Sequence, residues 1–376
     1  MSEKMRAIRK LSAAPGLTLE DVAIPQPGPH DVLVQVEAAS VCGTDLHIWN
    51  WDEWSQQRIH PPLTVGHEFS GSVVEVGNLV EQVTVGDYVS AESHVTCGHC
   101  FQCRTGQAHM CPHTQILGVD REGSFAEYVC VPESIIWKND RSKLSPVVAS
   151  IQEPFGNAVF ATLTHDMAGQ TVGVFGCGPI GLFSIGIARA SGASAVFAVD
   201  PVEGRRDLAL KMGANQVFSP IGEKDSVEQL LDANEGYGID IILEMSGAPA
   251  AITSAFSVVR NGGHMTLFGI PSKPVEIDVA ENMIFKNITV FALNGRRIWD
   301  TWYKTRWLLE SGVVNVEPLI THQMQFEQVN EAMELLADGS ACKIVLLPDG
   351  KLQTQVPKAE SGVTDDANIK GSVIHP

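Results

Sequence analysis

The sequence lacks any hydrophobic run long enough to cross a membrane. A spanning helix needs about 18 or more consecutive apolar residues, and no stretch of this chain approaches that length. The first residues, Met1 to Arg6, also lack the apolar core of a secretory signal. A cytoplasmic protein is therefore expected.

Positive charge is scarce. The chain has 26 Lys and Arg against 44 Asp and Glu, a formal net charge of -18 at pH 7. A phosphate backbone or an anionic membrane surface is bound by clustered Lys and Arg, which this balance does not favour. Neither nucleic acid nor a membrane is an expected partner, and a small molecule is.

Length and composition favour two domains. With 376 residues, of which 44% are hydrophobic, the chain is too long for one core and long enough for two. The first half is rich in strand patterns: residues 31–38 alternate after a Pro- and Gly-rich entry at 25–29, and shorter runs follow at 71–77 and 85–89. Short strands with glycine turns are typical of a small barrel.

A candidate catalytic metal site lies within this β-rich half. Cys42, His67 and Glu68 offer a thiolate, an imidazole and a carboxylate, and three protein ligands leave a fourth position of zinc open for substrate. Thr44 and His47 are three residues apart, so on a helix they share a face and can pass a proton outward. The alternative for this stretch alone is a buried thiol, a helix cap and a polar turn.

A second cluster consists of thiols alone, at Cys97, Cys100, Cys103 and Cys111. Four thiolates fit a closed, tetrahedral zinc site with a structural role. A [4Fe–4S] cluster is an alternative, but the spacing differs from the ferredoxin run, and paired disulfides do not suit a reducing compartment. The isolated thiols are interpreted as core residues: Cys130, Cys177 and Cys342.

The second half carries a dinucleotide-binding pattern. A buried-strand run at 171–175 leads directly into Gly176, Gly178 and Gly181, and helical and strand patterns then end on Asp200. The glycines let the backbone approach a pyrophosphate, and an acid about 20 residues further on accepts from the ribose hydroxyls. The alternative is a plain glycine turn. Further strands are predicted at 239–244, 264–269 and 288–292, which indicates a doubly wound α/β sheet.

The remaining segments set the predicted boundaries. Helices are expected at 295–304 and 326–336 and a strand at 343–347, and this part is expected to return to the first domain. We predict that residues 1–158 and 296–347 together form the first domain and that residues 159–295 form the second. A polar extension follows at 348–376, which is a flexible tail or a surface strap.

One segment has neither the two-residue period of a strand nor the 3.6-residue period of a helix. The hexad at 49–54, Trp-Asn-Trp-Asp-Glu-Trp, is both aromatic and acidic. It is either a packing element or a lid over the metal.

Together these motifs resemble the zinc-containing medium-chain alcohol dehydrogenase superfamily. The resemblance covers the chain to about residue 347 and implies a GroES-like β-barrel catalytic domain joined to a Rossmann-type coenzyme domain. Within the superfamily, the strings at 42–54, 152–158 and 301–304 resemble the bacterial and archaeal L-threonine 3-dehydrogenases. Phe155 stands where this group usually has Leu, and Asn294 where an aromatic residue is common.

The resemblance also implies roles for individual residues. Cys42, His67 and Glu68 would bind catalytic zinc, Glu153 would replace a ligand or relay protons, and the relay would run through Thr44 and His47. The residues implied in NAD binding are Gly176, Gly178, Ile180, Gly181, Asp200, Arg205, Phe268, Gly269, Ile270, Leu293 and Asn294.

The expected activity is zinc- and NAD-dependent oxidation of a secondary alcohol. The first candidate is L-threonine, giving 2-amino-3-ketobutyrate, and the alternative is a polyol or another secondary alcohol. A remote alternative is a non-catalytic NAD and zinc protein that responds to redox state, although mere binding needs no proton path. A homo-oligomer is expected, with a tetramer favoured.

Overall fold

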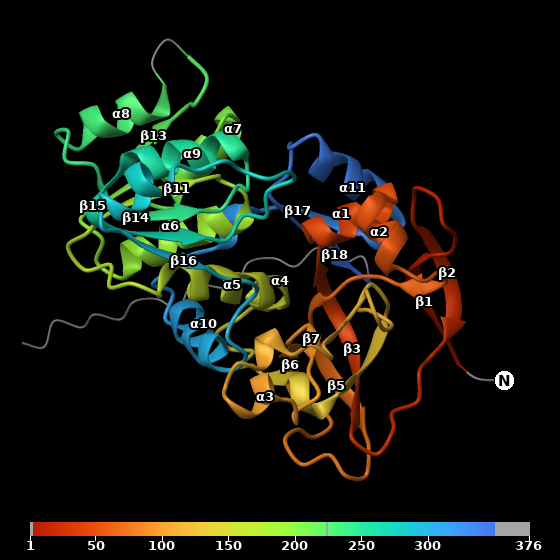
Figure 1. The fold of residues 1–376 in the computed structure, drawn as a ribbon. Helices are drawn as coiled ribbons and strands as arrows, with labels where there is room; N and C mark the ends of the chain where they lie inside the picture. Colours follow the sequence, from red (N-terminus) through yellow and green to blue (C-terminus); the bar gives the residue numbers. More distant parts are fainter. Residues whose placement is uncertain (1–2, 223–224, 350–376) are drawn as a thin grey trace, which may run out of the picture.

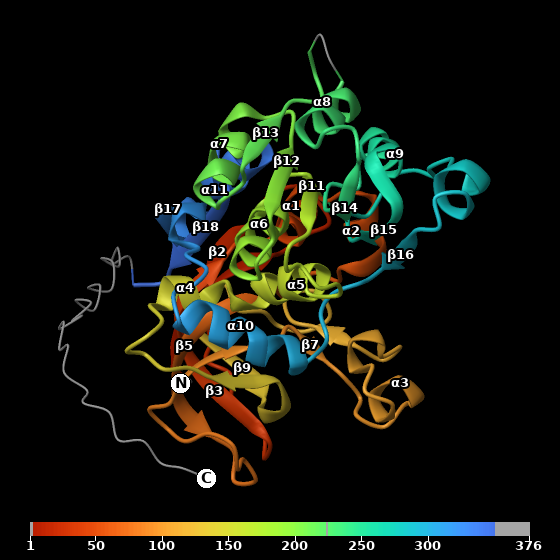
Figure 2. The same cartoon turned by 90° about the vertical axis from the view of Figure 1, so that its left-hand side faces the viewer.

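The computed structural model describes residues 3–222 and 225–349. The chain forms a β-rich unit and a unit built on a parallel sheet, and helices α5 (Gln152–Thr162) and α10 (Asp300–Glu310) lie between them (Figures 1 and 2). Within the described ranges, no helix has the length and apolar character needed to span a bilayer. Most of the predicted extension, from residue 350 onward, lies outside the described residues.

The β-rich unit contains two main sheets. Three strands pair in the order β2-β1-β4, and a larger sheet has the order β10-β6-β5-β3-β18-β17, with β9 also paired to β3. The strands are β1 (Lys4–Lys10), β2 (Thr18–Ala23), β3 (Asp31–Ser40), β4 (Leu63–Thr64), β5 (Glu68–Val76), β6 (Tyr88–Ala91), β9 (Tyr128–Pro132), β10 (Ile136–Lys138), β17 (Ile320–Gln325) and β18 (Lys343–Leu347). Because Val345 of β18 pairs with Ser40 of β3, the chain returns after the parallel sheet to the sheet it began.

The second unit is a six-stranded parallel sheet in the order β13-β12-β11-β14-β15-β16. Its strands are β11 (Thr171–Phe175), β12 (Ala195–Val199), β13 (Gln216–Phe218), β14 (Ile239–Glu244), β15 (Val259–Leu267) and β16 (Thr289–Ala292). Its helices are α6 (Pro179–Ala190), α7 (Glu203–Lys211), α8 (Ser226–Ala233) and α9 (Pro249–Val258). The order reverses between β11 and β14, which is where doubly wound sheets open a binding crevice.

Both faces of the parallel sheet are buried, as its apolar strands require. One core joins β11 and β12 to α5 and α6, and a second lies under α8 and α9. The β-rich unit has its own core, formed by alternate side chains of β3, β5 and β9 together with α11 (Val329–Ala337). The two-part fold class predicted from the sequence is confirmed.

Several predicted elements differ from the structure. The strand predicted at 264–269 is β15, which spans Val259–Leu267, and the strand pattern at 85–89 corresponds to β6, which begins only at Tyr88. The helix expected from residue 295 begins only at Asp300, because Gly295 (φ 64°) and Trp299 (φ 71°) both adopt positive φ values that interrupt a helix. The hexad at 49–54 is not aperiodic, because its two ends belong to the short helices α1 (Gly43–Asn50) and α2 (Glu53–Arg58).

Candidate active site

Strand pairing brings the first predicted ligand set together. Ser40 at the end of β3 pairs with Glu68 at the start of β5, so Cys42, which caps α1, meets His67 and Glu68. One ligand atom from each of these three residues lies within 4.8 Å of the others.

The donor set fits a metal ion. Glu68 Oε1 is buried and has no hydrogen-bond partner within the described chain. Buried polar atoms are rarely left without a partner, so a cation would satisfy an atom that otherwise costs free energy. A thiolate, an imidazole and a carboxylate are ligands that zinc accepts, and three of them leave a coordination position open.

The three candidate ligands are held in place by neighbouring groups that were not predicted from the sequence. Lys343 Nζ lies 2.5 Å from Glu68 Oε2, to which Ser40 Oγ also donates, and this leaves Oε1 available. Asp45 Oδ1 lies 3.8 Å from His67 Nδ1, and Asp45 Oδ2 accepts from the Cys42 amide at 2.9 Å. Carboxylates behind ligand imidazoles fix ring orientation. The sequence did contain one signal for Lys343, because it is a charged residue at the start of an otherwise apolar strand.

A buried ionic network adjoins this cluster and contains Glu153. Arg296 Nη2 lies 2.7 Å from Glu153 Oε1, and Ser93 Oγ donates to the same oxygen at 2.6 Å. Arg296 also pairs with Glu92, whose Oε2 accepts from Trp302 Nε1 at 2.8 Å. Burial works to raise the pKa of Glu92, but Arg296 and His94 hold that pKa well below its usual range.

This network is not a second open metal site. Glu92, His94 and Glu153 do have the spacing of metal ligands. The Arg296 guanidinium, however, already forms ion pairs with both carboxylates. Glu153 therefore stands beside the Cys42 cluster rather than within it.

The two predicted relay residues lie on α1. Thr44 Oγ1 is 3.7 Å from Cys42 Sγ, so the hydroxyl faces the ligand cluster. The side chain of His47 is 61% exposed, and its Nδ1 lies 2.5 Å from Asp52 Oδ2. Thr44 thus lies at the candidate ligands and His47 at the protein surface, which are the places that the predicted relay requires.

The four-cysteine lobe has the geometry of a closed site. The sulfurs of Cys97, Cys100, Cys103 and Cys111 lie within 4.8 Å of one another. Backbone amides point at them: the Cys100 amide is 3.4 Å from Cys97 Sγ, and the His113 amide is 3.4 Å from Cys111 Sγ. Such donors stabilise thiolates, and four thiolates complete a tetrahedral zinc shell. The pair β7 (His94–Val95) and β8 (Gln115–Ile116) closes the base of the lobe.

Gly176, the first glycine of the motif, and Asp200 line a cavity of about 340 Å³ at the carboxyl edge of the parallel sheet, together with Arg205 and Ser246. Gly176 has φ 94°, and a Cβ on Gly181 would lie 1.9 Å from the Gly176 carbonyl oxygen. Neither position admits a side chain. Asp200 is held at the cavity by the amides of Cys177 (2.7 Å) and Val202 (2.8 Å).

The other predicted cofactor residues lie apart from this cavity. Leu293 and Asn294 line a separate cavity of about 430 Å³ with His109 and Phe160. Ile180 is partly buried against the core below α6. Phe268 and Gly269 follow β15, where their amides donate to the Glu244 carbonyl, and Ile270 is exposed.

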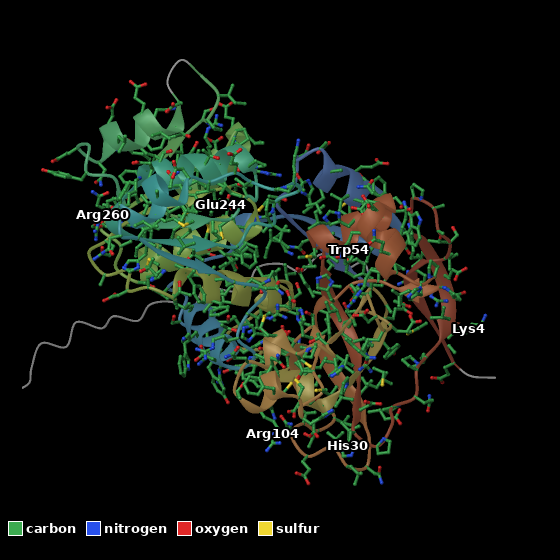
Figure 3. The ribbon with its side chains drawn as sticks, viewed as in Figure 1. Lys4, His30, Trp54, Arg104, Glu244 and Arg260 are labelled. Atoms are coloured by element: carbon green, nitrogen blue, oxygen red, sulfur yellow. The ribbon has the colours of Figure 1, made fainter. Side chains whose placement is uncertain are left out.

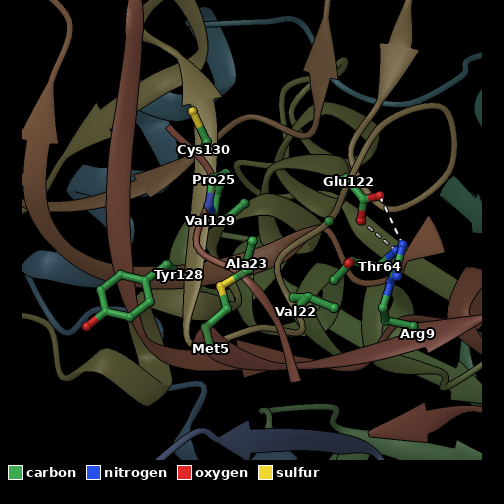
Figure 4. A pocket seen from close by; sticks show the side chains of 11 residues that line it. Met5, Arg9, Val22, Ala23, Pro25, Thr64, Glu122, Tyr128, Val129 and Cys130 are labelled. Carbon is green, nitrogen blue, oxygen red and sulfur yellow. Dashed lines mark hydrogen bonds and ion pairs between the residues drawn. The ribbon is translucent and has the colours of Figure 1, made fainter. Parts of the chain in front are cut away.

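One further cavity includes none of the predicted residues. It measures about 230 Å³ and lies against β1, β2 and β9, with Met5, Val22 and Cys130 in its wall (Figure 4). At its rim, Arg9 and Glu122 form an ion pair at 3.4 Å.

The two-unit fold and its thiolate-containing clusters define a zinc-binding dehydrogenase. Residues 28–141 match the family described as "Alcohol dehydrogenase GroES-like domain", and residues 179–311 match "Zinc-binding dehydrogenase". A curated relative, the L-threonine 3-dehydrogenase of Symbiobacterium thermophilum, is 49% identical over 93% of this chain and all of its own length. This chain belongs to the L-threonine 3-dehydrogenase family of zinc-binding dehydrogenases.

Solved structures agree with this fold. A zinc-binding dehydrogenase of Sinorhizobium meliloti bound to NADP has a TM-score of 0.86 at 28% identity, covering 92% of this chain and 100% of its own. The 2R,3R-butanediol dehydrogenase of Bacillus subtilis has a TM-score of 0.82 at 29% identity, covering 92% of this chain and 99% of its own. The resemblance found in the sequence is therefore confirmed.

Proposed function

We propose that this enzyme oxidises the 3-hydroxyl group of L-threonine to 2-amino-3-ketobutyrate, with zinc and NAD as cofactors. The proposal rests on the 49% identity of this chain to a curated L-threonine 3-dehydrogenase, which the match covers over its whole length. The cluster of Cys42, His67 and Glu68 supplies a matching site, because it combines zinc ligands with an open position.

Different residues of the chain would bind the metal and transfer the proton. The chemistry that the cofactors supply when bound is polarisation of the substrate oxygen and acceptance of a hydride. Cys42, His67 and Glu68 would hold the metal, and the Thr44 hydroxyl, 3.7 Å from Cys42 Sγ, would take the alcohol proton and pass it to His47. We assign Glu153 either to proton relay or to exchange with a zinc ligand.

We infer that NAD is preferred over NADP. The Asp200 carboxylate is fixed by two amides at the cavity that Gly176 also lines. A carboxylate at this position accepts from a ribose hydroxyl and repels an added phosphate. We assign Arg205 and the backbone at 268–270 and 293–294 to the rest of the cofactor.

The structural zinc is proposed for the four-cysteine lobe. Its sulfurs converge, and nearby amides donate toward them. A metal there would hold the lobe folded rather than bind substrate.

A substrate panel tests the proposed reaction. The zinc-loaded enzyme is incubated with NAD and, separately, L-threonine, D-threonine, sorbitol and 2,3-butanediol, and NADH absorbance is followed. L-threonine is expected to give the highest kcat/KM. A higher value for a diol or polyol would replace the substrate assignment, and silence with every alcohol would favour the non-catalytic NAD and zinc binder.

We further infer a homo-oligomer, with a tetramer favoured, that works in the cytoplasm. Exposed apolar side chains support association: Ile270, Ile284 and Phe285 are 86%, 65% and 71% exposed, and all three lie in the segment that connects β15 to the edge strand β16. Size-exclusion chromatography with light scattering would measure the assembly. The domain division at 158/159 and 295/296 stays a prediction, which the pairing of β18 with β3 supports.

A further inference from the structure

The aromatic and acidic segment 49–54 is the sequence feature that the proposed function leaves unused. It forms the tight connection between α1 and α2, in which Trp51 has the left-handed values φ 57° and ψ 46°. A bulky residue in this region is strained and persists only where surrounding contacts impose the conformation. Contacts from outside the turn must therefore hold Trp51 in this conformation.

Contacts from two other parts of the chain hold the turn. Trp49 Nε1 donates to Asn330 Oδ1 of α11 at 2.8 Å. On the other side, Lys10 Nζ lies 5.0 Å from the centre of the Trp51 ring and donates to the Trp49 carbonyl at 3.4 Å. Trp49 and Trp51 are thus part of the packed wall rather than an open lid.

The turn directs Asp52 back onto His47. Asp52 Oδ2 lies 2.5 Å from His47 Nδ1, while Oδ1 accepts from the Ser55 amide at 3.0 Å and so caps α2. Because each oxygen has its own partner, the carboxylate cannot rotate without losing one of them. The Trp54 ring lies 6.1 Å from the His47 ring, and Trp54 is placed on the β-rich unit in Figure 3.

We propose that Asp52 is a positioning residue for the proton relay that ends at His47. Its hydrogen bond fixes the imidazole tautomer with the proton on Nδ1, which leaves Nε2 as the nitrogen that accepts the proton arriving through Thr44. A carboxylate that holds an imidazole in this way sets both ring orientation and tautomer. The inference rests on the proposed relay and adds to it the group that orients its outer end.

A purely structural role for Asp52 makes a different prediction. An N-cap contributes about 1 kcal/mol to helix stability, and Asn caps a helix about as well as Asp. Asp52→Asn therefore keeps the cap of α2. Once its amide oxygen caps the helix, its amide NH₂ faces His47 Nδ1 and favours the opposite tautomer.

Kinetics in a double-mutant cycle test the proposal in the zinc-loaded enzyme. Asp52→Asn should lower kcat about 3- to 30-fold at pH 7, within the loss caused by His47→Asn, with little change in the KM for NAD. Added to His47→Asn, the same substitution should change kcat less than about two-fold, because Asp52 acts through His47. Glu53→Gln, which removes the adjacent exposed carboxylate from the same helix, is the matched control and should keep wild-type kcat.

Nuclear magnetic resonance supplies a readout that needs no substrate. In ¹⁵N-histidine-labelled enzyme, the His47 signals are those missing from His47→Asn. The wild type should show the Nδ1–H tautomer, and Asp52→Asn should move His47 toward Nε2–H. Should Asp52→Asn reduce folding yield, Asp52→Ser keeps a cap and should also release the tautomer.

The outcomes separate the two proposals. Losses that multiply independently in the double variant, or an unchanged tautomer in Asp52→Asn, would overturn the role of Asp52. Inactivity of the wild type toward L-threonine would instead overturn the proposed function. The tautomer measurement would still show whether Asp52 sets the tautomer of His47.

Discussion

Replacing Glu92 with Gln tests the buried network at the junction of the two units. Glu92 is fully buried and accepts from Arg296 and Trp302, which are 204 and 210 residues away in the chain. Gln keeps the shape of the side chain, but it loses the charge and presents an NH₂ group to neighbours that are themselves donors. The substitution therefore leaves Arg296 with Glu153 as its one carboxylate partner and places an amide NH₂ group against other buried donors.

The expected cost can be worked from the contacts. Removing one partner of a buried ion pair costs about 3–5 kcal/mol. Arg296 retains Glu153 at 2.7 Å, so we expect the low end of that range, about 3 kcal/mol at pH 7. Glu327→Gln is a matched control, since its ion pair with Arg6 is largely exposed and should be worth about 0–1 kcal/mol.

The pH dependence provides the sharper test. Because the folded pKa of Glu92 is held below its ordinary value, its contribution is present above the unfolded pKa of about 4.3 and is lost as pH falls toward the folded pKa. Gln does not titrate. The difference in unfolding free energy between wild type and Glu92→Gln should therefore narrow by about 1 kcal/mol between pH 7 and pH 3.5.

Urea unfolding of both proteins at several pH values measures this difference. Loss of metal at low pH affects both proteins alike and largely cancels in the comparison. A destabilisation below about 1 kcal/mol at pH 7 would mean that the network carries little net energy. A gap that stays constant down to pH 3.5 would refute the depressed pKa of Glu92.

Three further predictions concern the proposed sites. Cys42→Ser should abolish turnover in a folded protein that still binds NAD, whereas Cys100→Ser should mainly lower thermal stability; metal analysis, NAD titration and calorimetry compare them, and near-normal turnover in Cys42→Ser would contradict the catalytic assignment. The kcat/KM with NAD should far exceed that with NADP because of the Asp200 carboxylate, and equal values would remove that argument. His47→Asn should lower kcat about 10- to 100-fold near pH 7 and regain rate as pH rises, while Thr44→Val should recover less; a pH–rate profile decides this, and wild-type rates from pH 6 to 9 would leave His47 a packing residue.

Much of the architecture could be predicted from the sequence because its signals are local. The strands 171–175, 239–244 and 343–347 have the bounds that their apolar runs indicated. Such runs are bounded by glycine and polar turns, so strand limits can be read without knowledge of distant contacts. The glycine motif was equally readable, since its requirement for a missing Cβ arises within one turn.

The grouping of site residues depends on how far apart in the chain they lie. The cysteines of the lobe fall within one short segment, so their spacing alone indicated a common centre. Asp52 is only five residues from His47, yet their contact was missed because it needs the left-handed turn at Trp51. Nothing in the pattern of that segment specifies such a turn, which distant contacts from Lys10 and Asn330 hold in place.

The sequence by itself determined the fold class, the parallel sheet and the kinds of ligand available, because these follow from periodicity, composition and short spacings. Only the tertiary structure decided which buried charges face one another: Lys343 meets Glu68 across 275 residues, and Arg296 meets Glu92 across 204. Strand pairing and burial create these contacts, and a buried charge is tolerable only once its partner is in place. A partner that is set by the folded chain leaves no local pattern in the sequence.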